Sequence, residues 1–110
     1  MQMYIESQKE LYGRQVEVLD YGFASFDPIY TDGGLYIHFL YIKPECRKTG
    51  KGRDLLRFLR EKYEVIYFSG YIDKTSKTYK ESLLAHIKAG YDIVGATDIS
   101  LVVTLDAGKI

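Results

Sequence analysis

The sequence is poor in several features that stabilise or target proteins. Its 110 residues include one cysteine, Cys46, two prolines and no tryptophan. A single cysteine excludes an intrachain disulfide and a multi-cysteine zinc site, and it fits a reducing, intracellular setting. No apolar run approaches the roughly 18 residues that a membrane span needs, and residues 1–10 lack the charged-then-apolar order of a signal peptide. We therefore expect a cytoplasmic protein with no metal and no membrane segment.

The chain also lacks an excess of either charge, because 15 basic and 15 acidic side chains give a net charge of zero. The charges are unevenly spread. Residues 43–62 hold eight basic and three acidic side chains, whereas residues 1–42 hold two and six. A domain for general nucleic-acid binding is usually basic throughout, so a local anion site is favoured. A nucleic-acid-binding module on residues 43–62 stays as a lesser hypothesis, and it predicts an affinity that falls steeply with salt.

No repeat, low-complexity tract or Pro/Ser-rich linker divides the chain, and its length suits one domain over residues 1–110. Alternating and nearly continuous apolar runs predict strands at 14–27 (one or two, around Gly22), 35–43, 64–72, 91–96 and 99–105. We expect residues 27–34, with Pro28, to form a turn or loop. The run at 35–43 suits a central strand covered on both faces, and Pro44 should end it.

Two segments change to a helical period. From Gly52 onward, Leu55, Leu56 and Leu59 form one apolar stripe. Residues 77–90 predict a helix with Tyr79, Leu83 and Ile87 on one face, stopped by Gly90, and the last two strands should form a hairpin across Thr97 and Asp98. The order of strands, helix, strand, helix and two strands predicts a mixed α/β sheet with helices packed against it.

The basic segment ECRKTGKGRDLLRFL, residues 45–59, joins the strand to the first helix. The first N–H groups of a helix have no internal partner, and the helix dipole places partial positive charge there. Gly50 and Gly52 let the backbone come close to a ligand, so we expect an anion pocket strengthened by Arg47, Lys48 and Lys51. The segment is neither a P-loop, which needs G-x-x-x-x-G-K-[ST], nor a Rossmann fingerprint, which would need glycine at Leu55.

What remains is R-x-x-G-x-G after a strand that ends in a proline. The segment LYIKPECRKTGKGRDLLRFL, residues 40–59, resembles the cofactor motif of the GNAT (Gcn5-related N-acetyltransferase) family: a Val/Ile-x-Pro strand end, [Q/R]-x-x-G-x-[G/A] and a helix. LLAHIKAGYDIVG, residues 83–95, is similar to the family's LYxKxGFxxVG ending. The resemblance spans residues 21–105 and implies a GNAT-like acyl-CoA N-acyltransferase fold.

The resemblance implies acetyl-coenzyme A as the co-substrate and an acetyl transfer to an amine acceptor in a ternary complex. The backbone of Leu40, Tyr41 and Ile42 would pair with the pantetheine arm like an added strand. The pyrophosphate would bind to backbone N–H groups of the loop, at Arg47, Lys48, Thr49, Gly50, Lys51 and Gly52. The family separates the central strand from the next one, here 35–43 from 64–72, and the thioester lies in that opening.

Acetyl transfer needs a neutral amine, and a lysine-type amine has a reference pKa near 10.4, so a base is useful. His38 alternates with Leu40 and Ile42 on the central strand, where the family often places its base. It could equally be a hydrogen-bonded histidine of the sheet. His86 occupies the position where the family commonly has the tyrosine that acts as general acid. Tyr79 could supply the hydroxyl instead, or it could be a core residue. A backbone N–H in 40–42 would meet the oxyanion.

The N-terminal part is shorter than in the family, which has two helices between its first two strands. Residues 6–13 could form about two helical turns, so the acceptor side is either open or completed by a second subunit in a homodimer. An open side suits a protein or peptide amine better than an enclosed small molecule. Acidic residues hint at a cationic acceptor, or are solvated surface: Glu6, Glu10, Glu17, Asp20, Asp27 and Asp32. A degenerate GNAT fold that binds the cofactor or a partner without catalysis is the alternative function.

Overall fold

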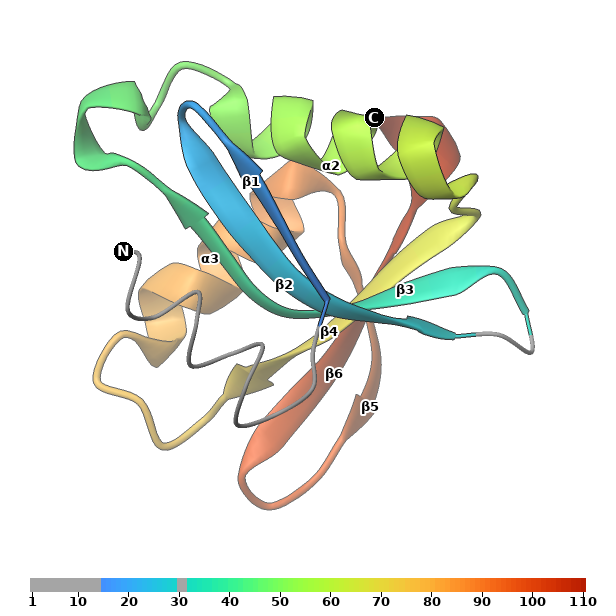
Figure 1. Ribbon diagram of the computed structural model, residues 1–110. Coiled ribbons are helices and arrows are strands. Elements are labelled where there is room, and N and C mark those ends of the chain that lie inside the picture. Colours follow the sequence, from blue (N-terminus) through green and yellow to red (C-terminus); the bar gives the residue numbers. More distant parts are fainter. Residues whose placement is uncertain (1–14, 30–31) are drawn as a thin grey trace.

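The computed structural model describes residues 15–29 and 32–110. In chain order the described elements are β1 (Gln15–Leu19), β2 (Gly22–Ile29), β3 (Gly34–Ile42), η1 (Pro44–Cys46), α2 (Lys51–Tyr63), β4 (Tyr67–Asp73), α3 (Tyr79–Ala89), β5 (Asp92–Ala96), β6 (Ser100–Asp106) and η2 (Ala107–Lys109). They form one mixed sheet with helices packed against it (Figure 1), which confirms the predicted fold class. The two-turn helix expected at 6–13 lies outside the described residues.

The sheet has the strand order β1-β2-β3-β4-β6-β5. All neighbouring strands are antiparallel except β3 and β4, which are parallel. Parallel neighbours need a crossover connection, and α2 provides it. The predicted hairpin of β5 and β6 is confirmed, since the N–H of Thr97 donates to the carbonyl of Ser100 at 2.8 Å.

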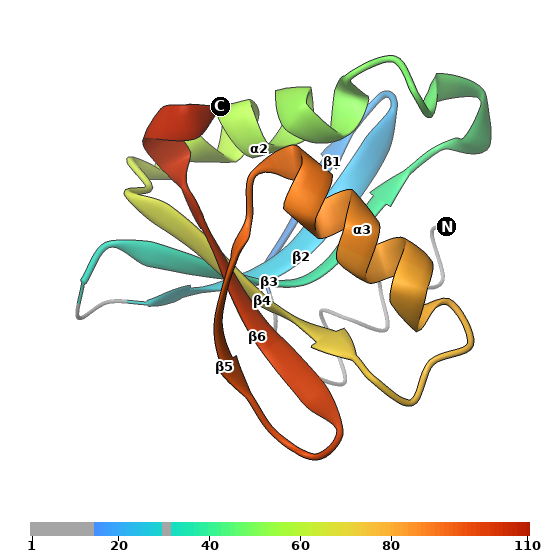
Figure 2. The ribbon, with the colours of Figure 1, turned by 180° about the vertical axis from the view of Figure 1, so that it is seen from behind.

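Both helices pack on the same face of the sheet. On β4, Phe68 and Ile72 are four residues apart and therefore point to the same side. Phe68 belongs to the larger buried cluster, to which α2 contributes the predicted stripe of Leu55, Leu56 and Leu59. Ile72 belongs to a second cluster, against which Tyr79 and Leu83 of α3 pack. Figure 2 shows α3 lying across this face.

The end of α3 agrees with one expectation and contradicts another. Gly90 follows the helix with φ of 101°, the left-handed conformation that favours glycine, so the predicted stop is confirmed. Ile87 was expected on the buried face, but its side chain is 51% exposed. A different face of α3 instead directs Ser82, His86 and Ala89 toward a cleft. Their spacing of four and three residues places them on one helical face.

Three strand expectations need correction. Pro28 lies inside β2, where it pairs with Leu35, and not in a loop. The strand after α2 begins at Tyr67 and not at residue 64, because the helix first closes with Glu64 in the left-handed conformation. Within β3 only Gly34 and Leu35 are buried, so this strand is not covered on both faces. The reason is that both described helices pack on the same face of the sheet.

Candidate active site

The two central strands separate along their length. Pairing between β3 and β4 is confined to Gly34 with Tyr67, Leu35 with Phe68 and Tyr36 with Ser69. Beyond Tyr36 the two strands diverge, as the ribbons in Figure 1 show. The expected opening between these strands is therefore present, and six residues of β3 follow the last paired position.

A cleft of about 560 Å³ occupies this opening. One wall is the second half of β3 and another is β4 at Ser69–Tyr71, while α2 and α3 contribute residues at one end and along one side. Gly52 and Arg53, in the first turn of α2, line the same cleft as His38 and His86. The structure thus brings Gly52, the last residue of the glycine motif, and both candidate histidines to one cavity, whereas residues 47–51 do not line it.

A β-bulge sets the position of His38. The register of β2 against β3 runs from Phe26 opposite Ile37 directly to Ser25 opposite Phe39, so His38 is the extra residue. A bulge re-aims the side chains on either side of it. Here Ile37, Leu40 and Ile42 all pack against the core cluster. The expectation that His38 shares a face with Leu40 and Ile42 is wrong, because the bulge reverses the alternation.

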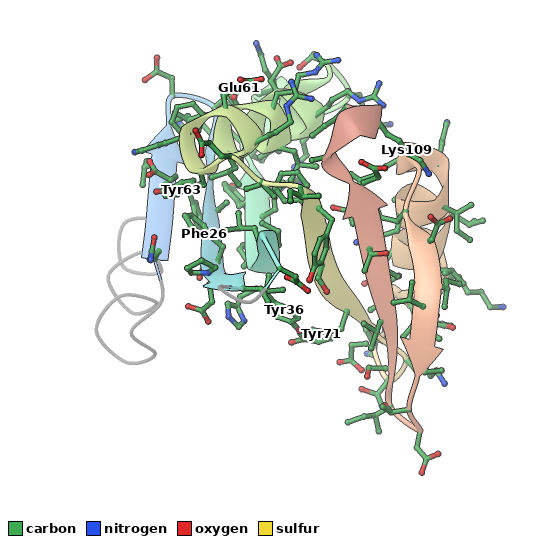
Figure 3. All side chains as sticks on the ribbon, turned by 90° about the vertical axis from the view of Figure 1, so that its right-hand side faces the viewer. Phe26, Tyr36, Glu61, Tyr63, Tyr71 and Lys109 are labelled. Atoms are coloured by element: carbon green, nitrogen blue, oxygen red, sulfur yellow. The ribbon has the colours of Figure 1, made fainter. Side chains whose placement is uncertain are left out.

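The imidazole of His38 is held by neighbours on two strands. Its Nε2 lies 2.6 Å from Oδ2 of Asp27 on β2, with side-chain exposures of 18% and 51%. The ring of Tyr36 meets it edge-on at 4.8 Å. Tyr36 in turn stacks with Tyr71 of β4 at 6.4 Å, and these two rings lie beside each other on the side of the sheet away from α2 (Figure 3).

His86 occupies the opposite wall of the cleft, on α3. Its Nδ1 lies 2.7 Å from the carbonyl oxygen of Ser82, one turn earlier in the helix. A carbonyl can only accept, so Nδ1 carries the proton and Nε2 of the neutral ring has the lone pair. The ring of Tyr91 meets His86 edge-on at 4.9 Å and also lines the cleft. Burial raises the pKa of Tyr91 to about 12.

Tyr79 lies beside a second, smaller cavity of about 220 Å³. This cavity has mostly polar walls from the end of β4, the following loop and the start of α3, including Asp73 and Ser76. His38, Tyr71 and Ser82 line both cavities. The ring of Tyr79 also packs against the second core cluster, so it is a core residue that borders the cavity.

The backbone of the basic loop changes direction sharply before α2 begins. Lys48 and Gly50 both have positive φ, 63° and 82°, and turn the chain into α2. The first α-helical bond runs from the N–H of Asp54 to the carbonyl of Gly50. The N–H groups of Lys51, Gly52 and Arg53 precede this bond and occupy positions that have no partner within a helix. A Cβ placed on Gly50 or Gly52 would meet no atom within 4 Å, so both glycines border open space.

Three backbone groups at this end of β3 already have partners: the N–H of Arg47, the carbonyl of Ile42 and the N–H of Lys43. The N–H of Arg47 donates to the carbonyl of Pro44 at 3.3 Å, so the free donors begin later in the loop than Arg47. The Nε of Arg47 donates to the carbonyl of Ile42 at 2.9 Å. The N–H of Lys43 donates to the carbonyl of Tyr21, in the β1–β2 turn, at 2.8 Å. The backbone groups of alternate residues point to opposite edges of a strand. The N–H and C=O of Tyr41 therefore point toward β2, whereas those of Leu40 and Ile42 point toward the opening.

Sequence reasoning missed two residues of this site, Asp27 and Tyr91. Asp27 was noted only as one of several acidic residues, and its contact with His38 depends on the pairing of β2 with β3. Tyr91 stands where the resemblance has the phenylalanine of a Gly-Phe pair, so its extra hydroxyl was the available signal. In the described part of the chain no three His, Cys, Asp or Glu side chains are grouped as a metal site. No helix there is long and apolar enough to cross a membrane.

Comparison with known proteins identifies the fold. No protein-family profile and no curated protein sequence matches the chain. Solved structures do match it. One, from Desulfovibrio desulfuricans and described as a GNAT-family acetyltransferase, superposes with a TM-score of 0.68 at 15% identity, over 94% of this chain and 77% of that one.

Two further matches have named activities or ligands. The ribosomal-protein-S18-alanine N-acetyltransferase of Escherichia coli has a TM-score of 0.59 at 14% identity, over 96% of this chain and 76% of that one. The PaiA N-acetyltransferase of Thermoplasma acidophilum, in complex with coenzyme A, has a TM-score of 0.64 at 14% identity, over 89% and 65%. The chain therefore has the GNAT acyl-CoA N-acyltransferase fold.

Proposed function

We propose that this protein is an acetyl-coenzyme A-dependent N-acetyltransferase of the GNAT family, which transfers an acetyl group to a primary amine in a ternary complex. The observation that carries the proposal is the cleft itself. It joins the N-terminal turn of α2, the free edge of β3 and two histidines within one opening of about 560 Å³. The shared fold of acetyltransferases supports it.

The residues around the cleft fit coenzyme A at two separate points. The start of α2 offers backbone N–H groups at Lys51, Gly52 and Arg53, and open space beside both loop glycines, which suits a diphosphate. Lys48, Thr49 and Lys51 are neighbours of this point in the chain, and Lys51 lies with its ammonium 3.6 Å from the carboxylate of Asp54. The opening-facing edge of β3 at Leu40 and Ile42 suits the amide groups of a pantetheine arm. There Arg47 shares the carbonyl of Ile42.

The bound co-substrate supplies an activated acyl carbon at the end of the arm, near the middle of the cleft. His38 borders both cavities, so the amine would approach it from the smaller one. The new C–N bond forms as the amine attacks the thioester carbon, and the C–S bond breaks. The amine proton goes to His38 as general base. The leaving thiolate takes a proton, and one backbone N–H of the 40–42 segment stabilises the charge on the carbonyl oxygen.

His86 and Tyr79 are the two candidates to donate a proton to the leaving thiolate, and they line different cavities. The neutral ring of His86 has no proton on Nε2, so it protonates a thiolate only as the imidazolium ion. Tyr79 carries a hydroxyl, but it borders the smaller cavity and not the larger cleft. We therefore assign the thiolate side to His86 and place Tyr79 on the acceptor side.

Binding of the co-substrate is tested by isothermal titration with acetyl-coenzyme A. We expect binding that is lost in the double variant Arg47→Ala, Gly50→Asp, which removes a cation and adds an anion beside the start of α2. Arg57→Ala is the matched control, since it removes an exposed cation from the same helix outside the cleft. Absence of binding in the unaltered protein, or equal binding by the double variant, would refute the proposal.

Turnover is tested by release of free coenzyme A thiol over a panel of primary amines and peptides. We expect thiol release with at least one acceptor, and its loss in His38→Ala. A nucleic-acid-binding module would instead bind nucleic acid with an affinity that falls linearly with salt on logarithmic scales, and coenzyme A would not compete with that binding. The acceptor class, a cytoplasmic location and a homodimer remain predictions from the sequence.

A cofactor-binding protein without turnover is the second candidate. The observation in its favour is the tautomer of His86, whose cleft-facing nitrogen accepts and does not donate while the ring is neutral. This candidate predicts tight acetyl-coenzyme A binding without thiol release for any amine, at pH values on both sides of 6.5, where an unperturbed imidazole titrates.

A further inference from the structure

The contact between His38 and Asp27 determines which nitrogen of the imidazole can act as a base. Nε2 lies 2.6 Å from the carboxylate oxygen of Asp27. An ionised carboxylate only accepts hydrogen bonds, so Nε2 carries the proton. In the neutral ring the lone pair is then on Nδ1. Asp27 therefore selects one of the two tautomers of His38.

The surrounding strands fix the direction of the ring as well as its tautomer. His38 is the bulged residue of β3. Asp27 on β2 pairs with Tyr36, which precedes His38 by two residues. The carboxylate of Asp27 and the edge-on ring of Tyr36 hold the imidazole on two sides. With 18% of its side chain exposed, His38 still reaches both cavities. A bulge that re-aims a side chain toward a cavity is typical of a functional position.

We propose that Asp27 is a positioning residue, which holds His38 in the Nε2–H tautomer so that the Nδ1 lone pair receives the proton of the amine. The proposal rests on the proposed function, because it assigns how the base of that reaction is prepared. During the transfer the amine proton moves to Nδ1 as the C–N bond forms and the C–S bond breaks. The imidazolium then carries a proton on each nitrogen, and the carboxylate of Asp27 lies against its positive charge.

The second histidine provides an internal contrast. His86 donates from Nδ1 to the carbonyl of Ser82, so the two rings are held in opposite tautomers. The sequence contains two histidines, so nitrogen spectra of the imidazoles hold two sets of signals. Long-range ¹H–¹⁵N correlation spectra of the unaltered protein above pH 8 should show Nε2–H for His38 and Nδ1–H for His86. The variant His86→Gln assigns the signals. A proton on Nδ1 of His38 would overturn the proposal without any activity measurement.

The kinetic arm uses Asp27→Asn, which has nearly the same shape but can donate as well as accept. We expect kcat to fall about 10- to 100-fold, since a positioned base contributes 10²- to 10⁴-fold. The KM for acetyl-coenzyme A and the melting temperature should change little, because the side chain of Asp27 is half exposed. The His38 spectrum should lose its single tautomer. Asp98→Asn, an exposed change in the β5–β6 turn, is the matched control and should leave the kinetics and spectra unchanged.

The outcomes separate the two proposals. Turnover by Asp27→Asn within twofold of the unaltered protein would overturn the positioning role and leave the acetyltransferase function intact. A lower melting temperature with an unchanged tautomer would show that the contact only stabilises the pairing of β2 with β3. Absence of thiol release in the unaltered protein, with Nε2–H still observed on His38, would overturn the acetyltransferase function and the catalytic role of the dyad with it.

Discussion

Replacing Gly52 by alanine should change stability and cofactor binding in opposite directions. Gly52 is the second residue of α2, lines the cleft, and has no atom within 4 Å of the place where a Cβ would stand. Its φ lies outside the left-handed region, so alanine causes no backbone strain. In a helix interior alanine is favoured over glycine by about 1 kcal/mol. In the first turn we expect about half of that.

The stability gain should be small but measurable. Unfolding entropy near 2.1 cal/mol/K per residue gives about 230 cal/mol/K for a chain of 110 residues. A gain of about 0.5 kcal/mol then raises the melting temperature by about 2 °C. Differential scanning calorimetry of the two proteins without ligand measures this change.

Binding of coenzyme A should become weaker in the same variant. A backbone N–H bonds to an oxygen at about 2.9 Å, and a methyl group beside it keeps a diphosphate farther away. A hydrogen bond to a charged group contributes about 1.5 to 3 kcal/mol, so loss of one raises the Kd roughly 10- to 150-fold.

The control is Gly95→Ala on β5. Its Cβ would meet Val102 at 3.7 Å, an ordinary contact, and Gly95 does not line the cleft. Coenzyme A should bind this variant as it binds the unaltered protein. If Gly52→Ala melts higher and also binds coenzyme A with unchanged affinity, the start of α2 does not contact the diphosphate, and the site assigned from the glycine spacing is wrong.

Three further predictions concern the scaffold. Leu59→Ala removes a fully buried side chain of the α2 stripe and should cost about 2 to 5 kcal/mol in urea unfolding, whereas the exposed Leu84→Ala on α3 should cost far less. Gly34→Ala would place a Cβ 2.3 Å from the ring of Tyr67, at the first paired position of β3 and β4, so it should lower the melting temperature; an unchanged value would show that Tyr67 moves freely. Burial raises the pKa of Tyr91 to about 12 from its usual value of 10, so the folded state favours the neutral phenol. The contribution of the neutral phenol to the free energy of unfolding is complete below pH 10 and is lost as pH rises through 12. Tyr91→Phe should therefore make the loss of unfolding free energy between pH 10 and 12 shallower, and an identical slope would contradict this assignment.

The elements of this protein follow from local patterns in its sequence. The leucine stripe of α2, the stop of α3 at Gly90 and the end of β3 before Pro44 depend on residues that are near each other in the chain. The motif from Arg47 to Gly52 likewise determines its own backbone form, because positive φ at Gly50 and the start of a helix are local properties.

Tertiary structure decided which side chains meet in the cleft. Ile87 follows the helical period of Tyr79 and Leu83, yet it is exposed, because α3 directs another face toward the cleft. The alternation that grouped His38 with Leu40 fails because of one extra residue in β3, and that bulge exists only in the register against β2. Asp27 is 11 residues from His38 in the chain, and only strand pairing brings its carboxylate to the imidazole. The sequence thus determined the backbone form of the glycine motif and the fold class, since both depend on local spacing. The partner of the proposed base depended on pairing between strands, which no local pattern contains.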